Sequence, residues 1–384
     1  MSLEKDITIA VAGHVCLDII PEFGAISIDH LIEPGKLFEI GSACLSTGGA
    51  VSNVGIALHK LGLKTRLLGK VGDDLFGQAI LNRFNEIDSS LTENMIPVSG
   101  ESSSYTIVVN PPGRDRSFWH HPGCNNTYSS RDISDNDLSG ISLFHFGYPP
   151  LMRQMFENAG EELVSLFKKV KSAGIISSLD MAYPDPNSYA GKANWRKILE
   201  RVLPFVDIFL PSLDEIRFML GYGTNKELSG ETLSRISGEL IDLGACIVGL
   251  KLGDQGFYLR TSGDLQRLGK IVPDVHQWTN REIYSPCYKV DVKGATGSGD
   301  ATIAGFLASL IKGNNPENTI NTAIAVGACS VETIDASSGI PDWSALQNKI
   351  KTGWEKRPVS DIFDEKQWFE KDYLLYGPAD LNDK

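Results

Sequence analysis

The sequence predicts an α/β fold, in which a doubly wound, mainly parallel sheet is covered by helices on both faces and carries a small β-sheet lid. Three observations predict it. Apolar, β-branched runs alternate along the chain with helical patterns of ten or more residues, as in repeated βα units. A hairpin pattern at 101–121 interrupts this alternation. The length of 384 residues suits one large α/β domain or two ordinary ones, and either can bury a sizeable core.

The first βα units lie near the N-terminus. The run ITIAVAGHVCLDII (7–20) begins as a nearly continuous β-branched stretch and breaks at Gly13, which predicts a buried strand followed by a turn. Between 48 and 62 the apolar residues recur at helical spacing, and Gly62 can end that helix. Residues 65–87 continue with a short strand, a Gly-Asp-Asp turn and an amphipathic helix.

The segment 101–121 reads as two strands around a Pro-Pro-Gly turn, with Arg114 and Arg116 near the tip. Together with the segment around 20–45, it would form the small lid. After this hairpin the βα alternation resumes. The further elements we expect are strands at 142–148, 175–180, 245–253 and 256–260, helices at 155–174, 193–206 and 317–332, and a strand followed by a helix within 207–220.

No linker-like composition divides the chain. We therefore expect one domain over residues 1–345, followed by a C-terminal extension, 346–384, of unknown role. The pattern of segment 270–290 predicts no element and no role.

Composition and charge limit the partners and the compartment. The formal net charge of −12 argues against nucleic acid or an anionic membrane as the partner, because both need a basic footprint. The six cysteines form no CxxC pair, which suits reduced, buried thiols. The sequence shows no apolar run near the ~18 residues of a membrane span and no signal-peptide pattern. We expect a cytoplasmic protein.

The stretch DVKGATGSGDATIAGFLASL (291–310) places a glycine-rich turn before a helical pattern. It is not a P-loop, because Asp300 and Ala301 stand where that motif has Lys and Ser or Thr. It is not a dinucleotide fingerprint either, because Thr302 replaces the third glycine. The first amides of the helix are unpaired donors at the positive end of its dipole, so they can bind an anion such as phosphate.

Asp300, at the start of this helix, has two readings. It can cap the helix, because acids are favoured in the first turn. It can also act beside a transferring phosphoryl group, where a carboxylate takes the proton from an attacking hydroxyl. Taken alone, the stretch leaves both readings open.

Two long motifs resemble one known family. TGSGDATIAGF is similar to the TGAGD signature of the ribokinase-like (PfkB) carbohydrate kinases, and STGGAVSNVGIALHKLGLKTRLLGKVGDDLFG resembles their N-terminal glycine signature. The order of other landmarks agrees over roughly residues 7–341, including a strand ending at Asp18, SLD before a proline-containing loop, VDIFLPSLDE and VGLKLGDQGFYL. The resemblance implies a ribokinase-like fold and ATP-dependent phosphoryl transfer to a hydroxyl of a sugar or a nucleoside.

The resemblance also implies roles for individual residues. The catalytic set would be Asp300 as general base, with Gly297, Ser298 and Gly299 supplying the anion-hole amides. Substrate hydroxyls would be held by Asp18, Gly48, Gly49 and Asn53. The nucleotide would lie beside Lys251, Gly253, Ala325 and Ala328. Glu215 would help to hold Mg²⁺ through water.

The chain departs from the family pattern at two positions. Ser212 stands where the Asn-x-x-Glu motif around Mg²⁺ has Asn, which puts the metal shell in question. Gly294 stands where members commonly have an acid associated with a monovalent-cation site, so K⁺ dependence is also in question. Asp291, three residues earlier, could replace that acid only if the loop were reshaped.

Two alternatives remain open at the level of sequence. A catalytically quiet sugar- or nucleotide-binding regulatory protein would explain Ser212 and Gly294, but it would have no need for Asp300. A sugar-phosphate kinase would need Arg114, Arg116 or another basic residue in the acceptor pocket. The family resemblance further implies a possible homodimer through the lid, for which an exposed sheet edge gives a physical reason.

Overall fold

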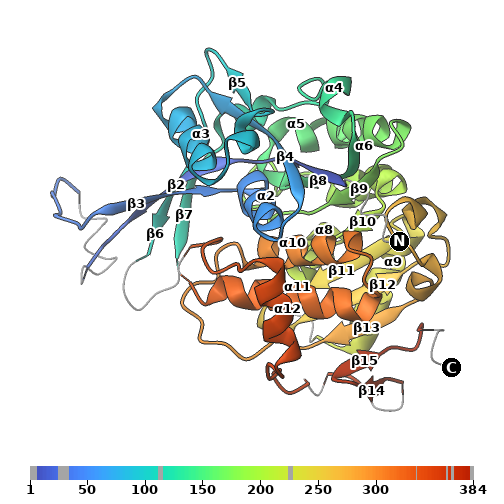
Figure 1. The fold of residues 1–384 in the computed structure, drawn as a ribbon. Coiled ribbons are helices and arrows are strands. Elements are labelled where there is room, and N and C mark those ends of the chain that lie inside the picture. The colour runs from blue at the N-terminus through green and yellow to red at the C-terminus, as the bar shows by residue number, and fades with distance from the viewer. Residues whose placement is uncertain are drawn as a thin grey trace.

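The computed structural model describes residues 7–24, 34–110, 116–223, 228–333, 335–359, 362–364 and 367–380. Within them, one large sheet of 11 strands runs through the molecule (Figure 1). In sheet order its strands are β14 (Phe369–Lys371), β15 (Leu374–Tyr376), β13 (Glu282–Ser285), β12 (Phe257–Thr261), β11 (Ile247–Lys251), β10 (Ile208–Phe209), β9 (Ile176–Leu179), β8 (Ile141–Gly147), β1 (Thr8–Gly13), β4 (Lys64–Gly72) and β5 (Ile96–Val98).

The sheet is parallel from β5 to β11 and antiparallel from β11 to β14. The prediction of a mainly parallel sheet is therefore confirmed. The antiparallel end was not predicted as such. Its strand β13 comes from segment 270–290, and β14 and β15 come from the C-terminal extension, so both segments contribute to the main sheet.

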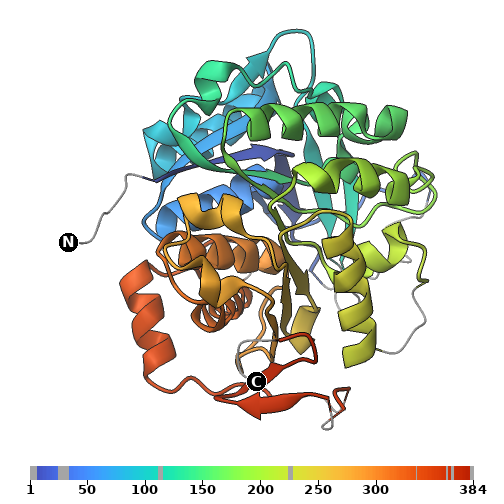
Figure 2. The ribbon, with the colours of Figure 1, turned by 90° about the vertical axis from the view of Figure 1, so that its right-hand side faces the viewer.

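Helices cover both faces of this sheet (Figure 2). The side chains of β1 show why, because Ile9 and Val11 pack into one apolar cluster while Ala10 and Ala12 pack into the other. One cluster includes residues of α2 (Ala50–Lys60), α3 (Leu75–Ile87), α10 (Ser298–Ile311), α11 (Pro316–Val331) and α12 (Trp343–Lys351). The other includes residues of α4 (Asp135–Leu138), α5 (Arg153–Phe156), α6 (Glu161–Ser172), α7 (Trp195–Val202), α8 (Leu213–Met219) and α9 (Gly230–Asp242).

The helix expected at 155–174 is interrupted. It consists of the end of α5, a 3-10 helix at Glu157–Ala159 and α6. Asn158, Ala159 and Gly160 all have left-handed backbone angles, with φ of 51°, 54° and 73°. Three such residues in a row break an α-helix, although the apolar spacing continues across them. The helix α9 was not among the expected elements.

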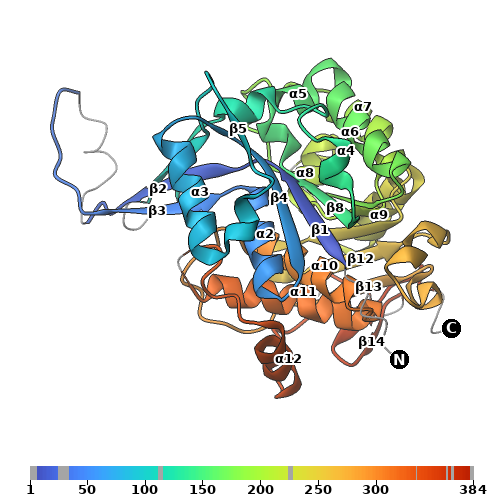
Figure 3. The ribbon, with the colours of Figure 1, turned by 45° about the horizontal axis from the view of Figure 1, so that its top comes forward.

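The predicted lid is a separate sheet of four strands that projects from the body (Figure 3). Its strands, in order, are β3 (Ala43–Gly48), β2 (Cys16–Pro21), β6 (Tyr105–Val109) and β7 (Ser117–His121). The expected hairpin is the antiparallel pair β6–β7. Its Pro-Pro-Gly tip, Arg114 and residues 25–33 lie outside the described residues.

The lid sheet is larger than expected. It begins at Cys16 and extends to Gly48, beyond the expected limits of 20 and 45. As a result, Asp18 lies inside β2 rather than at the end of the first strand, which already ends at Gly13. Among the described helices, none is long and apolar enough to cross a membrane.

Candidate active site

Several polar side chains meet at the carboxyl ends of the parallel strands, where the lid joins the body. Tyr148 follows β8, Asp180 follows β9 and Lys251 ends β11. Asp300 lies in the first turn of α10, and Asn53 lies in the first turn of α2. Side chains of this edge of an open α/β sheet commonly form the ligand site.

Asp300 is 2% exposed and is held by two donors from other elements. Its Oδ2 accepts hydrogen bonds from Asn53 Nδ2 at 2.8 Å and from the Tyr148 hydroxyl at 2.7 Å. Its Oδ1 is buried and has no hydrogen-bond partner. The side chain therefore does not cap its own helix, and one oxygen is left for another donor. Burial raises the pKa of Asp300, although the bonds from Tyr148 and Asn53 and the charge of Lys251 oppose that rise.

The glycine turn before α10 has a fixed shape. Gly297 is the N-cap residue, with φ 75°. A Cβ at Gly297 would lie 2.3 Å from the Cβ of Ala336, which is far closer than any real contact. Gly297 is therefore required both by its backbone angle and by its neighbour.

Lys251 places a positive charge beside this turn. Its Nζ would lie 3.8 Å from a Cβ at Gly299, and it donates to Asp180 Oδ1 at 2.6 Å. Burial opposes the charge of Lys251, but Asp180 and Glu215 outweigh that effect and raise its pKa. Asp180 is 1% exposed, and its Oδ2 has no hydrogen-bond partner. A cation, two partly unsatisfied carboxylates and the first amides of α10 thus lie together, and the Ser298 amide among them donates to the Ala295 carbonyl at 3.3 Å.

Glu215 and Ser212 form the capping box of α8. Glu215 Oε2 accepts from Ser212 N at 2.7 Å, and Ser212 Oγ accepts from Glu215 N at 3.3 Å. Ser212 thus acts as a helix cap where the family pattern has Asn. Within the described part of the chain, no group of three or more His, Cys, Asp or Glu side chains could enclose a metal ion.

On the lid side, two glycines make room for polar side chains. A Cβ at Gly48 would lie 2.3 Å from Asp18 Oδ2, so the carboxylate of Asp18 occupies that space. Gly49 has φ 85°, and a Cβ there would lie 2.5 Å from His14 Nδ1. The His14 ring lies beside His120, with 3.2 Å between their Nε2 atoms. Gly48 and Gly49 therefore leave space that the side chains of Asp18 and His14 fill, so these side chains cover the backbone of the two glycines.

A small cavity of about 40 Å³ lies between the lid and the body. Its lining includes Asp18, Arg116, Thr296 and Asp335. Arg116, from the start of β7, donates a hydrogen bond to the Thr296 hydroxyl in the turn before α10. The lid therefore touches the glycine turn before α10 directly, and the space left between them has about the volume of one water molecule.

A second cavity, of about 220 Å³, lies on the other side of the glycine turn before α10. Lys251, Gly253 and Ala328, which the family resemblance places beside a nucleotide, line it together with Gly299. Ala325 is fully buried and is not in the lining, which takes Ile324, Gly327 and Val331 from the same helix instead. Arg357, from the C-terminal extension, also lines this cavity and donates to Asp254 at 2.9 Å.

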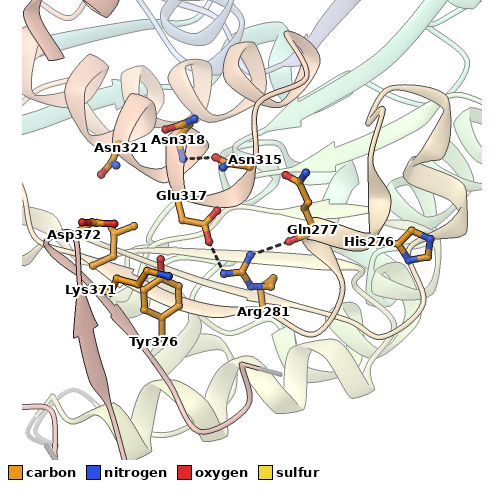
Figure 4. Close-up of a pocket in the computed structure, with 11 residues that line it drawn as sticks. His276, Gln277, Arg281, Asn315, Glu317, Asn318, Asn321, Lys371, Asp372 and Tyr376 are labelled. Atoms are coloured by element: carbon orange, nitrogen blue, oxygen red, sulfur yellow. Dashed lines mark hydrogen bonds and ion pairs between the residues drawn. The ribbon is translucent and has the colours of Figure 1, made fainter. Parts of the chain in front are cut away.

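The chain has a larger cavity, of about 640 Å³, that lies apart from these groups (Figure 4). It lies between the start of α11 and the β14–β15 hairpin. Arg281, its buried cation, is satisfied by Asp380, Glu317 and the Gln277 carbonyl. Because the buried charge of Arg281 is already paired, it is not available to bind or activate a ligand in this cavity.

Sequence reasoning missed Tyr148 and His14, and used Asp180 only as a landmark. Each follows a buried β-strand directly, at the carboxyl edge of the sheet. That position was the available signal, because polar residues after parallel strands converge at one edge. Asp291, the possible replacement for the missing acid, is exposed at the surface.

Comparisons with known proteins agree with this geometry. The chain matches the pfkB family of carbohydrate kinases over residues 8–343. A protein of Archaeoglobus fulgidus named as an uncharacterized sugar kinase is 27% identical over 286 residues, covering 74% of this chain and 98% of that protein. A probable fructokinase-7 of Arabidopsis thaliana is 23% identical, covering 91% of this chain and 94% of that protein.

Solved structures show the same fold. The structure of Arabidopsis thaliana ribokinase complexed with ribose and ATP has a TM-score of 0.71, with 20% identity, and covers 90% of this chain and 99% of that one. A fructokinase of Xylella fastidiosa with bound ATP has a TM-score of 0.68, with 19% identity, and covers 90% and 98%. The fold, the site and the match over nearly the whole chain lead to one conclusion: this protein belongs to the pfkB family of carbohydrate kinases.

Proposed function

We propose that this kinase transfers the γ-phosphoryl group of ATP to a hydroxyl of an uncharged sugar or nucleoside, with Asp300 as general base. The observation that carries the proposal is the buried, unpartnered Oδ1 of Asp300, one turn from the amides of Gly297 to Gly299 and near Lys251. The ribokinase and fructokinase structures of the same fold that contain ATP support the choice of nucleotide.

In this mechanism the acceptor hydroxyl donates its hydrogen bond to Asp300 Oδ1. As the oxygen attacks phosphorus, its proton passes to Oδ1, and the bond between the γ-phosphorus and the β,γ-bridging oxygen breaks to release ADP. The amides at the start of α10 and the Lys251 ammonium stabilise the charge on the transferring group. The cavity lined by Gly253 and Ala328 would hold the rest of the nucleotide.

The residues present also fit a magnesium ion. Asp180 offers a buried oxygen without a hydrogen-bond partner, and its other oxygen accepts a hydrogen bond from Lys251 Nζ at 2.6 Å.

 

Magnesium usually takes one or two carboxylates and keeps several waters beside phosphate oxygens. We therefore assign Asp180 and Glu215 to the shell of a Mg²⁺ ion, which when bound would neutralise charge on the phosphates.

The acceptor would lie between Asp300 and the lid, and the charges there favour an uncharged molecule. Asp18 and Asp335 outnumber Arg116 around the small cavity, and Arg116 already donates to Thr296. A phosphorylated acceptor would meet two carboxylates in this space. Because the present cavity holds about one water, we infer that the lid moves outward to admit the acceptor and then closes over it.

Asp18 gives the first testable prediction. Burial raises the pKa of Asp18 to about 6, with hydrogen bonds from Cys16 and Thr106 opposing part of the rise. As the pH falls through about 6, the carboxyl gains a proton and loses an acceptor oxygen, so kcat/KM for the acceptor should fall. Asp18→Asn should lower kcat/KM by roughly tenfold to a hundredfold and remove this pH dependence. Steady-state kinetics from pH 5 to 8 would measure both effects. An unchanged kcat/KM for the acceptor would refute the assignment, and the KM for ATP serves as the control.

Arg116 gives a second prediction, because it links the lid to the catalytic turn. Arg116→Gln should raise the KM for the acceptor by about fivefold to tenfold and increase ADP release without acceptor, since an open lid admits water. Arg83→Gln is the matched control, because Arg83 is exposed on α3 and pairs only locally with Glu86. If Arg116→Gln behaves like Arg83→Gln in both assays, the contact with Thr296 does not control the lid.

We also propose that two copies associate through their lids. Leu45, Phe118 and Trp119 on the lid strands are 47%, 53% and 59% exposed. Contiguous exposed apolar surface that is rimmed by polar residues marks protein–protein interaction sites. Sedimentation analysis would show a dimer that Trp119→Ser weakens.

The proposed function is tested by ADP release with Mg-ATP against free sugars, sugar acids, sugar phosphates and nucleosides. We expect turnover with an uncharged sugar or nucleoside and little with sugar phosphates. Turnover with sugar phosphates alone would favour the sugar-phosphate kinase instead. Binding of sugar and ATP without any turnover would contradict the role given to Asp300.

A further inference from the structure

Tyr148 has an unusual backbone conformation at the centre of the site. It follows β8 and precedes Pro149, and its φ and ψ of 67° and 41° lie in the left-handed region. A bulky residue is rarely found there, because its Cβ crowds the backbone. Such a conformation persists only where the surrounding structure holds it, and it is often found at functional sites.

This conformation brings the Tyr148 hydroxyl to the general base. The hydroxyl donates to Asp300 Oδ2 at 2.7 Å, and Asn53 Nδ2 donates to the same oxygen at 2.8 Å. Oδ1 receives no hydrogen bond. Two donors on one oxygen fix the rotation of the carboxylate, so that the other oxygen has a defined direction.

We propose that Tyr148 is a positioning residue for phosphoryl transfer, an inference that rests on the proposed role of Asp300. The Tyr148 hydroxyl holds Oδ2 of Asp300 so that Oδ1 meets the acceptor hydroxyl. The tyrosine keeps its own proton throughout, because the proton from the acceptor passes to Oδ1. Its hydroxyl also stabilises the ionised carboxylate, which opposes the effect of burial on the pKa of Asp300.

Other charged groups surround this pair and remain in place when the hydroxyl is removed. Lys251 faces Asp300, and Asp180 after β9 and Glu215 in α8 act on Tyr148. The His14 ring lies 6.0 Å from the Tyr148 ring, and burial lowers the pKa of His14, so that it is neutral. The effect of the Tyr148 hydroxyl on the pKa of Asp300 can therefore be separated from the effects of Lys251, Asp180 and Glu215.

The test is Tyr148→Phe, which keeps the ring and removes the hydroxyl. We expect kcat to fall about tenfold, since the carboxylate is less well oriented. The acidic limb of the kcat profile should move to higher pH by about one unit, because the base loses a donor to its charged form. The KM for ATP should not change. Tyr128→Phe is the matched control, because it removes a buried hydroxyl that donates to the Leu68 carbonyl at 2.8 Å, away from Asp300.

An acidic limb that stays at the wild-type pH, with kcat also unchanged, would overturn the proposal. If Tyr148→Phe does not fold, 3,5-difluorotyrosine at position 148 keeps the ring and makes the hydroxyl a stronger donor, so the limb should then move to lower pH. A limb that does not move in that variant would likewise overturn the proposal. Failure of the proposed function is distinguishable, because Asp300→Asn would then retain wild-type turnover whatever Tyr148→Phe does.

Discussion

Replacing Asp300 by Asn is expected to lower kcat by roughly a hundredfold to ten-thousandfold, the range expected when a general base is lost. An amide has almost the same shape, so Asn53 and Tyr148 can still lie against it. It cannot take the proton from the acceptor. ATP binding should be little changed, because Lys251 and the turn amides remain. Steady-state ADP release and ATP titration would measure the two effects separately.

Asp207→Asn is the control for this substitution. Asp207 is also fully buried and also has one carboxylate oxygen without a hydrogen-bond partner. It precedes β10, whereas Asp180 follows the parallel neighbour β9, so Asp207 lies at the opposite edge of the sheet from the site. This variant should lose stability, because Ser177 and Arg267 contact the carboxylate, but should keep kcat. Equal kcat losses in both variants would contradict a specific role for Asp300.

Replacing Gly297 by Ala is expected to lower kcat by about a hundredfold, as when a donor is lost from an anion hole. The added Cβ would lie 2.3 Å from Ala336 Cβ, so the turn must shift. The amides of Ser298 and Gly299 would move with it. Stability should also fall, by roughly 1–2 kcal/mol for the left-handed backbone and roughly 1–3 kcal/mol for the overpacking.

Gly221→Ala separates the loss of stability caused by the left-handed backbone angle from the loss caused by overpacking. Gly221 follows α8 with φ 74°, and nothing lies within 4 Å of a Cβ placed there. This variant should therefore lose only the stability that belongs to the backbone angle, and its kcat should match that of the unmodified protein. Denaturant unfolding and ADP release would measure both. If Gly297→Ala retained full turnover, the turn amides would not be the anion site.

The elements predicted from sequence were those with long, clear periodicity. The β-branched run of β1 and the apolar spacing of α2 gave the right elements near the right residues. The interruption at Gly160 could not be predicted, because the apolar spacing of α6 continues across a local change of backbone angle. The short strands β14 and β15 were also missed, because three residues carry too little pattern and because the pairing of β15 with β13 and of β14 with β15 is set by the fold.

The site shows a similar division. The motifs around Asn53 and Asp300 predicted that these residues belong to one site, and the structure joins their side chains through one hydrogen bond. Tyr148 was not predicted, because nothing in the chain before Pro149 indicates a left-handed backbone that turns its hydroxyl toward α10. The helix-capping role of Ser212 was not predicted either, because its hydrogen bonds with Glu215 depend on where α8 begins. Local patterns identify elements and motifs, whereas partners that are distant in sequence require the fold.

The most direct test of the central claim is phosphorus NMR of a reaction that contains Mg-ATP and the preferred uncharged acceptor. Phosphoryl transfer to an alcohol predicts one phosphomonoester for each ADP formed, with little inorganic phosphate. Inorganic phosphate as the main product, or no consumption of ATP with any acceptor of the panel, would contradict it.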